Sequence, residues 1–490
     1  MTLHEAAEAG DVAKLKTLLA EVASVDTRDQ DAGTALMRAA AAGQVAAVDL
    51  LLAHGPDIEA RDRYGKTALY WAGSLAVANR LIASGADIHA EIENRETLLH
   101  HVGWGETEFD RDFAQLLIAH GADIHSRTSS GGTPLHSAAE AGNVGMIDLL
   151  LGHGADIEAR DGAGRTPLFY SRSAAAVDVL IAHGANIDAR DENGLPALYC
   201  AWPVEVTRAL VARGADVRAR GKFGWTALHM EDLLRIERRD IIAFLVSEGA
   251  DVNARDELGN TPLHEAREAD VAGLLLSLGA DIQAVNEFVR TALHEAAQHR
   301  SGSLVELLLK QGASLHSRDL NGDTPLHVAT TKEAAKSLLQ HGADANARND
   351  AGATPLHMAD GEDIVVLLLA HGADANARDR EGRSPLHRLP RYQGSDGVLG
   401  LLLRHGADPG ARSNNGRTPL HEQVACGEVS INTLLTAGAD VNALDDEGKT
   451  PLDLALKWTN DGGARANALK IRGGKPGGSG GGYSSDDSRQ

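Results

Sequence analysis

The sequence predicts an all-α solenoid, in which short helix pairs follow one another along the chain and are joined by hairpin-like loops. The string Gly-x-Thr-Pro-Leu-His returns roughly every thirty residues, followed each time by an apolar run and Gly-Ala-Asp. One clean copy runs from Ser129 to Asp161 and is 33 residues long. A unit of that size holds two helices and a loop and cannot bury its apolar face alone, so neighbouring units must stack.

Each part of the copy from Ser129 to Asp161 has a local structural reason. Thr133 is a good N-cap, and Pro134 suits the first helical position, where its missing N–H costs nothing. An Ala-Ala pair then gives the inner helix a small face that lets the next unit approach closely. The outer helix carries an apolar stripe and ends at Gly154, a left-handed cap; the stripe is Ile147, Leu149, Leu150 and Leu151.

The array is long and varies in a regular way. Fifteen units fill residues 1 to about 472, with heads at Thr2, Thr34, Thr67, Thr97, Thr133, Thr166, Pro196, Thr226, Thr261, Thr291, Thr324, Thr354, Ser384, Thr418 and Thr450. In six units the head lies 18 residues before the cap Gly instead of 21. Removing three residues from a helix rotates the part that follows by about 300°, which is close to a full turn, so the apolar faces nearly keep their register. We therefore expect a shorter inner helix or turn within an intact stack.

Three units are longer than the others. Their extra residues are Trp104–Phe109, Leu233–Arg238 and Pro390–Asp396. We expect these insertions to lengthen a helix or to bulge from the turn between the two helices. Insertions in solenoids map to loops on one face, which is often the binding face.

The repeated Thr-Pro-Leu-His head and the 33-residue unit resemble the ankyrin repeat family, and the resemblance covers residues 1–472. It implies a right-handed superhelix of helix pairs, with atypical repeats at both ends. It also implies that the histidines of the head form local hydrogen bonds, and that hairpin tips and inner helices line a concave groove that grips other proteins. Residues 473–490 are expected to be a flexible Gly/Ser-rich tail.

Composition and charge limit the partners. The chain has a formal net charge of −22, which argues against nucleic acid or an anionic membrane as the main partner. It lacks an apolar stretch long enough to insert into a membrane. Its two cysteines, Cys200 and Cys426, lie far apart in the array, which favours a reducing cytoplasm. We expect a monomer.

No residue pattern indicates catalysis, a cofactor or a metal. Gly65-Lys66-Thr67 resembles the end of a phosphate-binding loop, but Ala60 stands where that loop needs Gly. His294 and His299 lie five residues apart, about 140° around a helix, so they cannot share one metal ion. The 22 histidines recur with the repeat, which indicates a role in folding. We therefore predict that the protein is not an enzyme.

The residues that depart from the repeat are the better guide to function. Of 17 aromatic residues, 12 fall between Tyr64 and Trp225. Hairpin tips carry aromatic and basic residues of the kinds that anchor interfaces: Arg63, Tyr64, Lys66, Lys222, Phe223, Trp225, Phe288 and Arg290. Arg220 and Lys222 are expected to form a basic rim beside Phe223 and Trp225. Binding is favoured for the tips, whereas packing is favoured for Tyr70, Trp71, Phe169, Tyr170 and Tyr199.

Two classes of function follow. The first, implied by the family resemblance, is a non-enzymatic scaffold, adaptor or inhibitor that binds one or more proteins through the groove and the tips. The second is a ligand-binding or enzymatic site assembled in the groove, for which no acid–base or nucleophile constellation stands out. The Ala-, Gly- and Arg-rich composition also leaves open a bacterial effector or immunity protein that acts by protein binding.

Overall fold

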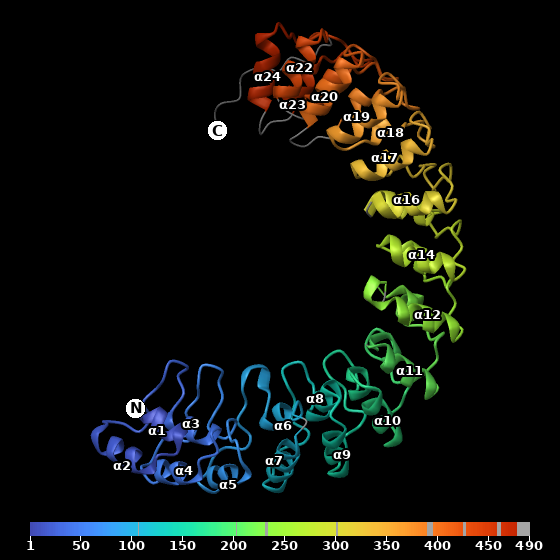
Figure 1. The fold of residues 1–490 in the computed structure, drawn as a ribbon. Coiled ribbons are helices and arrows are strands. Elements are labelled where there is room, and N and C mark those ends of the chain that lie inside the picture. Colours follow the sequence, from blue (N-terminus) through green and yellow to red (C-terminus); the bar gives the residue numbers. More distant parts are fainter. Residues whose placement is uncertain are drawn as a thin grey trace, which may run out of the picture. The chain divides into compact units, whose positions relative to one another are not determined.

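The computed structural model describes residues 1–105, 107–201, 203–230, 234–299, 302–389, 395–424, 428–457 and 462–477. It divides into two compact units: residues Met1–Ala227 with Ser247–Ala250, and residues Leu228–Val246 with Asp251–Gln490. Within each unit, helix pairs stack one after another (Figure 1). Among the described residues, extended chain pairs only at two isolated bridges, Arg190 with Pro196 and Val285 with Thr291. The prediction of an all-α solenoid is confirmed.

Every repeat contributes one outer helix. These helices are α2 (Val12–Glu21), α4 (Val45–Leu52), α5 (Leu75–Ala83), α7 (Glu108–Ala119), α9 (Val144–Gly152), α10 (Ala174–Ala182), α11 (Val204–Ala212), α12 (Arg239–Ser247), α14 (Ala269–Ser277), α16 (Gly302–Lys310), α17 (Lys332–Gln340), α19 (Glu362–Ala370), α20 (Ser395–Arg404), α22 (Glu428–Thr436) and α24 (Gly462–Ile471). In α9, Met146, Ile147 and Leu150 are buried, so the helix turns the expected apolar stripe towards its neighbours. Gly154 follows it at φ +90°, the left-handed cap that the sequence predicts.

The inner elements are shorter and less regular. They are α1 (Leu3–Ala9), α3 (Ala35–Ala41), α6 (Leu98–Val102), α8 (Pro134–Ala141), η2 (Pro167–Tyr170), η3 (Ala197–Cys200), η5 (Ala227–His229), α13 (Pro262–Glu265), α15 (Ala292–His299), α18 (Pro355–Met358), η7 (Pro385–His387), α21 (Pro419–Gln423) and α23 (Pro451–Lys457). The units headed by Thr67 and Thr324 have only turns at this place. All six units with the 18-residue spacing therefore have a shortened inner element, as that spacing predicts.

Small and aliphatic side chains hold neighbouring repeats together. Ala138 and Ala139 of α8 are fully buried, so the inner helices of adjacent repeats approach closely. Inner elements pack on inner elements, as α6 does on α8, and outer helices on outer helices, as α7 does on α9. In the N-terminal unit the hairpin loops project on one side of the inner helices, and α2, α4, α5, α7 and α9 lie on the other (Figure 1).

Two of the predicted insertions lie partly outside the described residues, which exclude Leu233 and 390–394. The first insertion is described except for Glu106, and there α7 extends to 12 residues. At the C-terminal end, residues 473–477 lie against the last repeat: Gly477 N–H donates to Asp453 Oδ2 at 2.8 Å, and Lys475 N–H donates to Asn442 Oδ1 at 2.7 Å. The rest of the predicted tail, 478–490, lies outside the described residues.

Candidate functional site

The hairpin loops between repeats share one construction. Asp191 shows it: its Oδ1 accepts the N–H of Asn193 at 2.8 Å and that of Leu195 at 2.9 Å. An Asp or Asn side chain at the same position closes most other hairpins in this way. Many neighbouring tips are also bonded to each other; for example, Glu192 N–H donates to Ala163 O at 2.9 Å. Within each of the two units, tips bonded in this way lie along one edge.

An arginine precedes most of the hairpins and strengthens this edge. Arg190 donates from one nitrogen to Gly194 O in its own loop and to Arg220 O in the next repeat, both at 2.6 Å. Arg61, Arg127, Arg160 and Arg348 make the equivalent pair of bonds. Arg220 is part of the same series, because its NH1 donates to Gly224 O at 3.0 Å. Arg220 is exposed, and its expected place with Lys222 in a basic rim stays a prediction.

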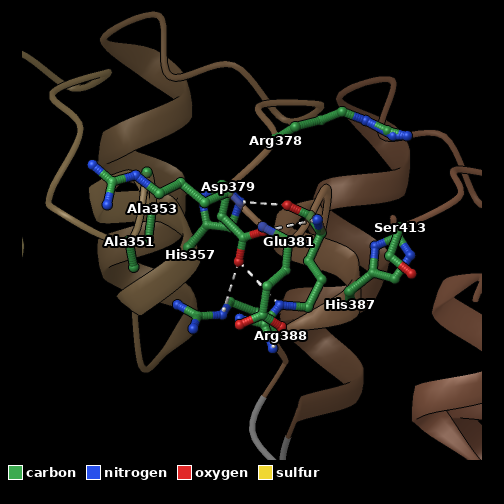
Figure 2. Close-up of polar contacts among 12 residues, drawn as sticks. Ala351, Ala353, His357, Arg378, Asp379, Glu381, His387, Arg388 and Ser413 are labelled. Carbon is green, nitrogen blue, oxygen red and sulfur yellow. Dashed lines mark hydrogen bonds and ion pairs between the residues drawn. The ribbon is translucent and has the colours of Figure 1, made fainter. Parts of the chain in front are cut away.

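A buried charge is held at the base of one hairpin. The Asp379 side chain is 1% exposed and lies 3.0 Å from Arg383 Nε and 3.4 Å from Arg388 Nε. Figure 2 shows Asp379 and Arg388 facing each other across the loop. Burial acts to raise the pKa of the Asp379 carboxyl, but the hydrogen bonds and charges of the two arginines and the Arg383 N–H outweigh it, so the pKa is lowered. A carboxylate fixed in this way stabilises the fold and is not available as a general base.

In several repeats, the residue before the head contacts the first hairpin residue of the next repeat. Asn349 donates to the buried Asp323 at 2.7 Å, where a second carboxylate would repel the first. Leu195 is buried beside Gly221, where a Cβ would lie 2.3 Å from Leu195 Cδ2. These pairs specify which faces of consecutive repeats fit each other.

The histidines of the repeat heads also link neighbouring repeats, through hydrogen bonds of their rings. In the copy at Thr133, the backbone N–H of Thr133 donates to His136 Nδ1 at 3.0 Å, so the remaining ring proton lies on Nε2 and is donated to Arg165 O of the next repeat at 3.1 Å. Desolvation lowers the pKa of these rings, and that of His294 falls to about 4. The same arrangement recurs at His100, His264, His294, His327, His357, His387 and His421.

Aromatic residues at core positions mostly pack, as predicted. Tyr70, Phe169 and Tyr199 are buried. The Tyr70 hydroxyl donates to Glu96 O at 2.9 Å, and that of Tyr199 to Trp225 O at 3.2 Å, so tyrosine replaces the head histidine in linking repeats. Trp71 is different, since it is 36% exposed and donates from Nε1 to Asp62 at 2.9 Å.

The first predicted tip presents an exposed aromatic ring with a cation above it. Tyr64 is 50% exposed, and the Arg63 guanidinium lies 4.7 Å from its ring centroid. Arg63 also pairs with Asp31 of the preceding tip at 2.9 Å. Lys66 lies 4.9 Å from the ring centroid of Trp71. The structure thus joins Arg63 with Tyr64, and Lys66 with Trp71, on one edge.

The second predicted tip has an unusual backbone. Gly221 stands at the position of Asp191, so this hairpin has no side chain that closes the loop, and Leu195 lies where a Cβ of residue 221 would be. Its turn has two successive left-handed residues, Phe223 at φ +64° and Gly224 at φ +74°. Phe223 is 55% exposed, and its ring centroid lies 5.5 Å from that of Trp225, which is 37% exposed. The pair is presented to solvent beside Lys222.

At the third predicted tip, the aromatic residue Phe288 is exposed as expected, but the cation Arg290 is largely buried. Phe288 is 51% exposed, but the Arg290 side chain is only 17% exposed. Arg290 Nε lies 3.3 Å from Glu295, and its NH2 donates to Gln298. Its guanidinium therefore ties the hairpin to the inner helix α15 and does not present a free charge at the tip.

Other exposed apolar side chains at the edge were not singled out from the sequence. Leu258 is 50% and Leu320 is 61% exposed, and each lies on a hairpin next to that of Phe288. Single leucines on a surface are common, so only their position beside Phe288 makes them notable. Trp104, at the start of the first insertion, is 53% exposed.

The described residues contain no group of three or more His, Cys, Asp or Glu side chains placed to hold a metal ion. None of their helices combines the length and apolar character that crossing a membrane requires. Cys200 is half-buried, and Cys426 lies outside the described residues.

Stacked two-helix repeats with hairpin loops define the class of helical repeat proteins. A family model described as ankyrin repeats (3 copies) matches residues 3–92, 73–161, 99–191, 197–286, 269–349, 293–379, 329–410 and 387–466. The chain belongs to the ankyrin repeat family. Ankyrin repeats are general protein–protein interaction modules, and the fold is typically a non-enzymatic scaffold.

One solved structure, the human ASB11 ankyrin repeat domain, is similar to part of the chain. The two share 28% sequence identity over 44% of this chain and 99% of that domain, with a TM-score of 0.40. Among curated protein sequences, none matches the chain.

Proposed function

We propose that the protein is a non-enzymatic scaffold, adaptor or inhibitor that binds partner proteins through its hairpin tips and the adjoining groove. The exposed pair of Phe223 and Trp225, whose rings are tilted at 52° to each other, carries the proposal. Two large aromatic rings on a hairpin add little to a core built from Leu, Val and Ala, and large exposed apolar side chains mark interaction sites. Tyr64 under Arg63 offers a second anchor of the same chemical kind.

The interior chemistry supports binding over catalysis. Buried Asp379 is held by two arginines, and the head histidines are held between a backbone N–H and a carbonyl of the next repeat. Asp379 is held within its own repeat, and the histidines connect one repeat to the next. The proposal further holds that the protein acts as a monomer in a reducing cytoplasm, which the two widely separated cysteines favour.

Replacing Phe223 and Trp225 together by Ser is expected to weaken partner binding at least about tenfold, or ~1.4 kcal/mol. The thermal midpoint should stay almost unchanged, because both rings are largely exposed. The measurement is quantitative affinity capture with the full chain, followed by titration of the purified partner. Val366→Ser is the matched control, since Val366 is 46% exposed but lies on outer helix α19.

Two results would count against this site. A double variant that melts early yet retains its partner would show that the two rings pack. A Val366→Ser variant that loses the partner as completely would move the interface to the outer helices.

A further inference from the structure

The hairpin at residues 285–290, in the second unit, has apolar residues at positions where the next hairpin has polar residues or glycine. In the next hairpin, at residues 318–323, these positions are Arg318, Asn321 and Gly322. In the hairpin at residues 285–290 they are Val285, Phe288 and Val289, which are 36%, 51% and 38% exposed. Three departures in one short loop, all towards exposed apolar side chains, set this hairpin apart from its neighbours.

Val289 is also in a strained conformation. Its φ is +59°, the left-handed region, where the neighbouring hairpins have Gly259 at +74° and Gly322 at +73°. A β-branched residue is a genuine outlier there, because its Cβ approaches the backbone. Non-glycine residues held in this region cluster at functional positions. The strain therefore marks an apolar side chain kept where glycine is easier to accommodate.

Main-chain hydrogen bonds join this hairpin to the tips on both sides. Glu287 N–H donates to Leu258 O at 2.8 Å, and Leu320 N–H donates to Phe288 O at 3.0 Å. Leu258, Val285, Phe288, Val289 and Leu320 thus occupy three adjacent, bonded hairpins, and together they are named the apolar crest. The crest lies wholly within the second unit.

The charges around the apolar crest are acidic. Glu257 and Glu287 are exposed on the same tips, and in the described parts of the chain neither carboxylate has an ion-pair partner. The cations on these hairpins are engaged: Arg290 pairs with Glu295 at 3.3 Å, Arg318 lies 3.7 Å from Asp350, and Arg255 also has an interaction partner. The chain as a whole carries a formal net charge of −22. A complementary ligand is therefore apolar and basic.

We propose that the apolar crest binds a basic segment of a partner protein. An aromatic or aliphatic side chain of that segment packs against Phe288 and Val289, and its Lys or Arg side chains pair with Glu257 and Glu287. Phosphate backbones and anionic lipid surfaces are repelled by the same carboxylates. The inference rests on the proposed function and adds to it a second surface and the chemistry of its ligand.

The test is selection of a displayed library of random 16-residue peptides on the full chain, with affinities of the selected peptides then measured by fluorescence anisotropy. We expect the selected sequences to combine apolar residues with Lys or Arg. Phe288→Ser with Leu320→Ser should weaken their binding at least about tenfold. Charge reversal by Glu257→Lys with Glu287→Lys should weaken it to a similar extent.

Two further variants separate binding from folding. Val289→Gly removes an apolar side chain and relieves backbone strain, so it should weaken binding without lowering the thermal midpoint. Leu444→Ser is the matched control: Leu444 is 47% exposed and holds the Val285 position in the last repeat's hairpin, so its loss should leave affinity within about twofold.

Other outcomes overturn the inference. Selection of acidic peptides, or of peptides that bind the Phe288→Ser/Leu320→Ser variant as tightly as the unaltered chain, contradicts it. So does a library from which no peptide is selected. If any of these occurs while Phe223→Ser with Trp225→Ser still loses its protein partner, only the assignment of the apolar crest fails and the proposed function stands.

Discussion

Leu263→Ala and Leu326→Ala are each expected to destabilise the array by about 2–5 kcal/mol, but only locally. Leu263 is 2% and Leu326 is 3% exposed, so truncation leaves a cavity between repeats. Each repeat contacts only its neighbours, and the loss should therefore stay near the altered repeat. Hydrogen exchange is the measurement, and amides of the flanking helices, such as α14 for Leu263, should lose protection.

Leu258→Ala provides the control for the Leu263 variant. Leu258 lies on the same repeat's hairpin but is 50% exposed, so its truncation should leave protection almost unchanged. A uniform loss of protection from Met1 to Leu469 after Leu263→Ala would contradict the nearest-neighbour account.

Acidification from pH 7 to pH 4.5 is expected to destabilise the whole array. The folded-state pKa of each buried head histidine lies below the unfolded value of about 6.5, so the unfolded chain binds more protons in this window. Stability is therefore complete above about pH 6.5 and is lost as pH falls towards the folded values. For His294, whose pKa is about 4, complete protonation would cost about 3 kcal/mol.

The structural reason is the fixed tautomer of the ring. Protonation of His294 Nδ1 would point a proton at the Thr291 N–H that now donates to it at 3.1 Å. Thermal unfolding followed by circular dichroism at steps between pH 4.5 and 8.5 checks this, with a falling midpoint below pH 6.5 and a flat one above it. His294→Gln should reduce the dependence, whereas His153→Gln, at an exposed position after α9, should not. A midpoint that is constant down to pH 5 would show that these histidines do not control stability.

Much of the fold was predictable because the same local rules recur in every repeat. Thr133 and Pro134 start an inner helix and Gly154 ends an outer one for reasons contained in the unit itself. The 18-residue spacing also predicts the shortened elements, such as η2 and η3. Which of them becomes a 3₁₀ helix, a single α turn or a simple turn depends on packing with both neighbours, and the spacing does not contain that information.

The candidate site was less predictable, because its properties depend on contacts between repeats. The tip aromatics Tyr64, Phe223 and Phe288 are recognisable as departures from the repeat, and all three are exposed. Phe223 is left-handed in a hairpin that starts at Gly221, and the residue packed beside Gly221, Leu195, lies 26 residues earlier in the chain (221 − 195). Arg290 looks like a free cation in the sequence, and only the position of Glu295 on α15 shows that it is paired.

The most direct test of the central claim, that the interior joins repeats and the hairpin tips bind, is hydrogen exchange of the full chain with and without its captured partner. The account predicts that added protection is concentrated in the hairpins at residues 61–66, 221–225 or 286–290 and in the inner elements beside them. Added protection confined to outer helices such as α9 and α19, with these hairpins unchanged, would contradict it.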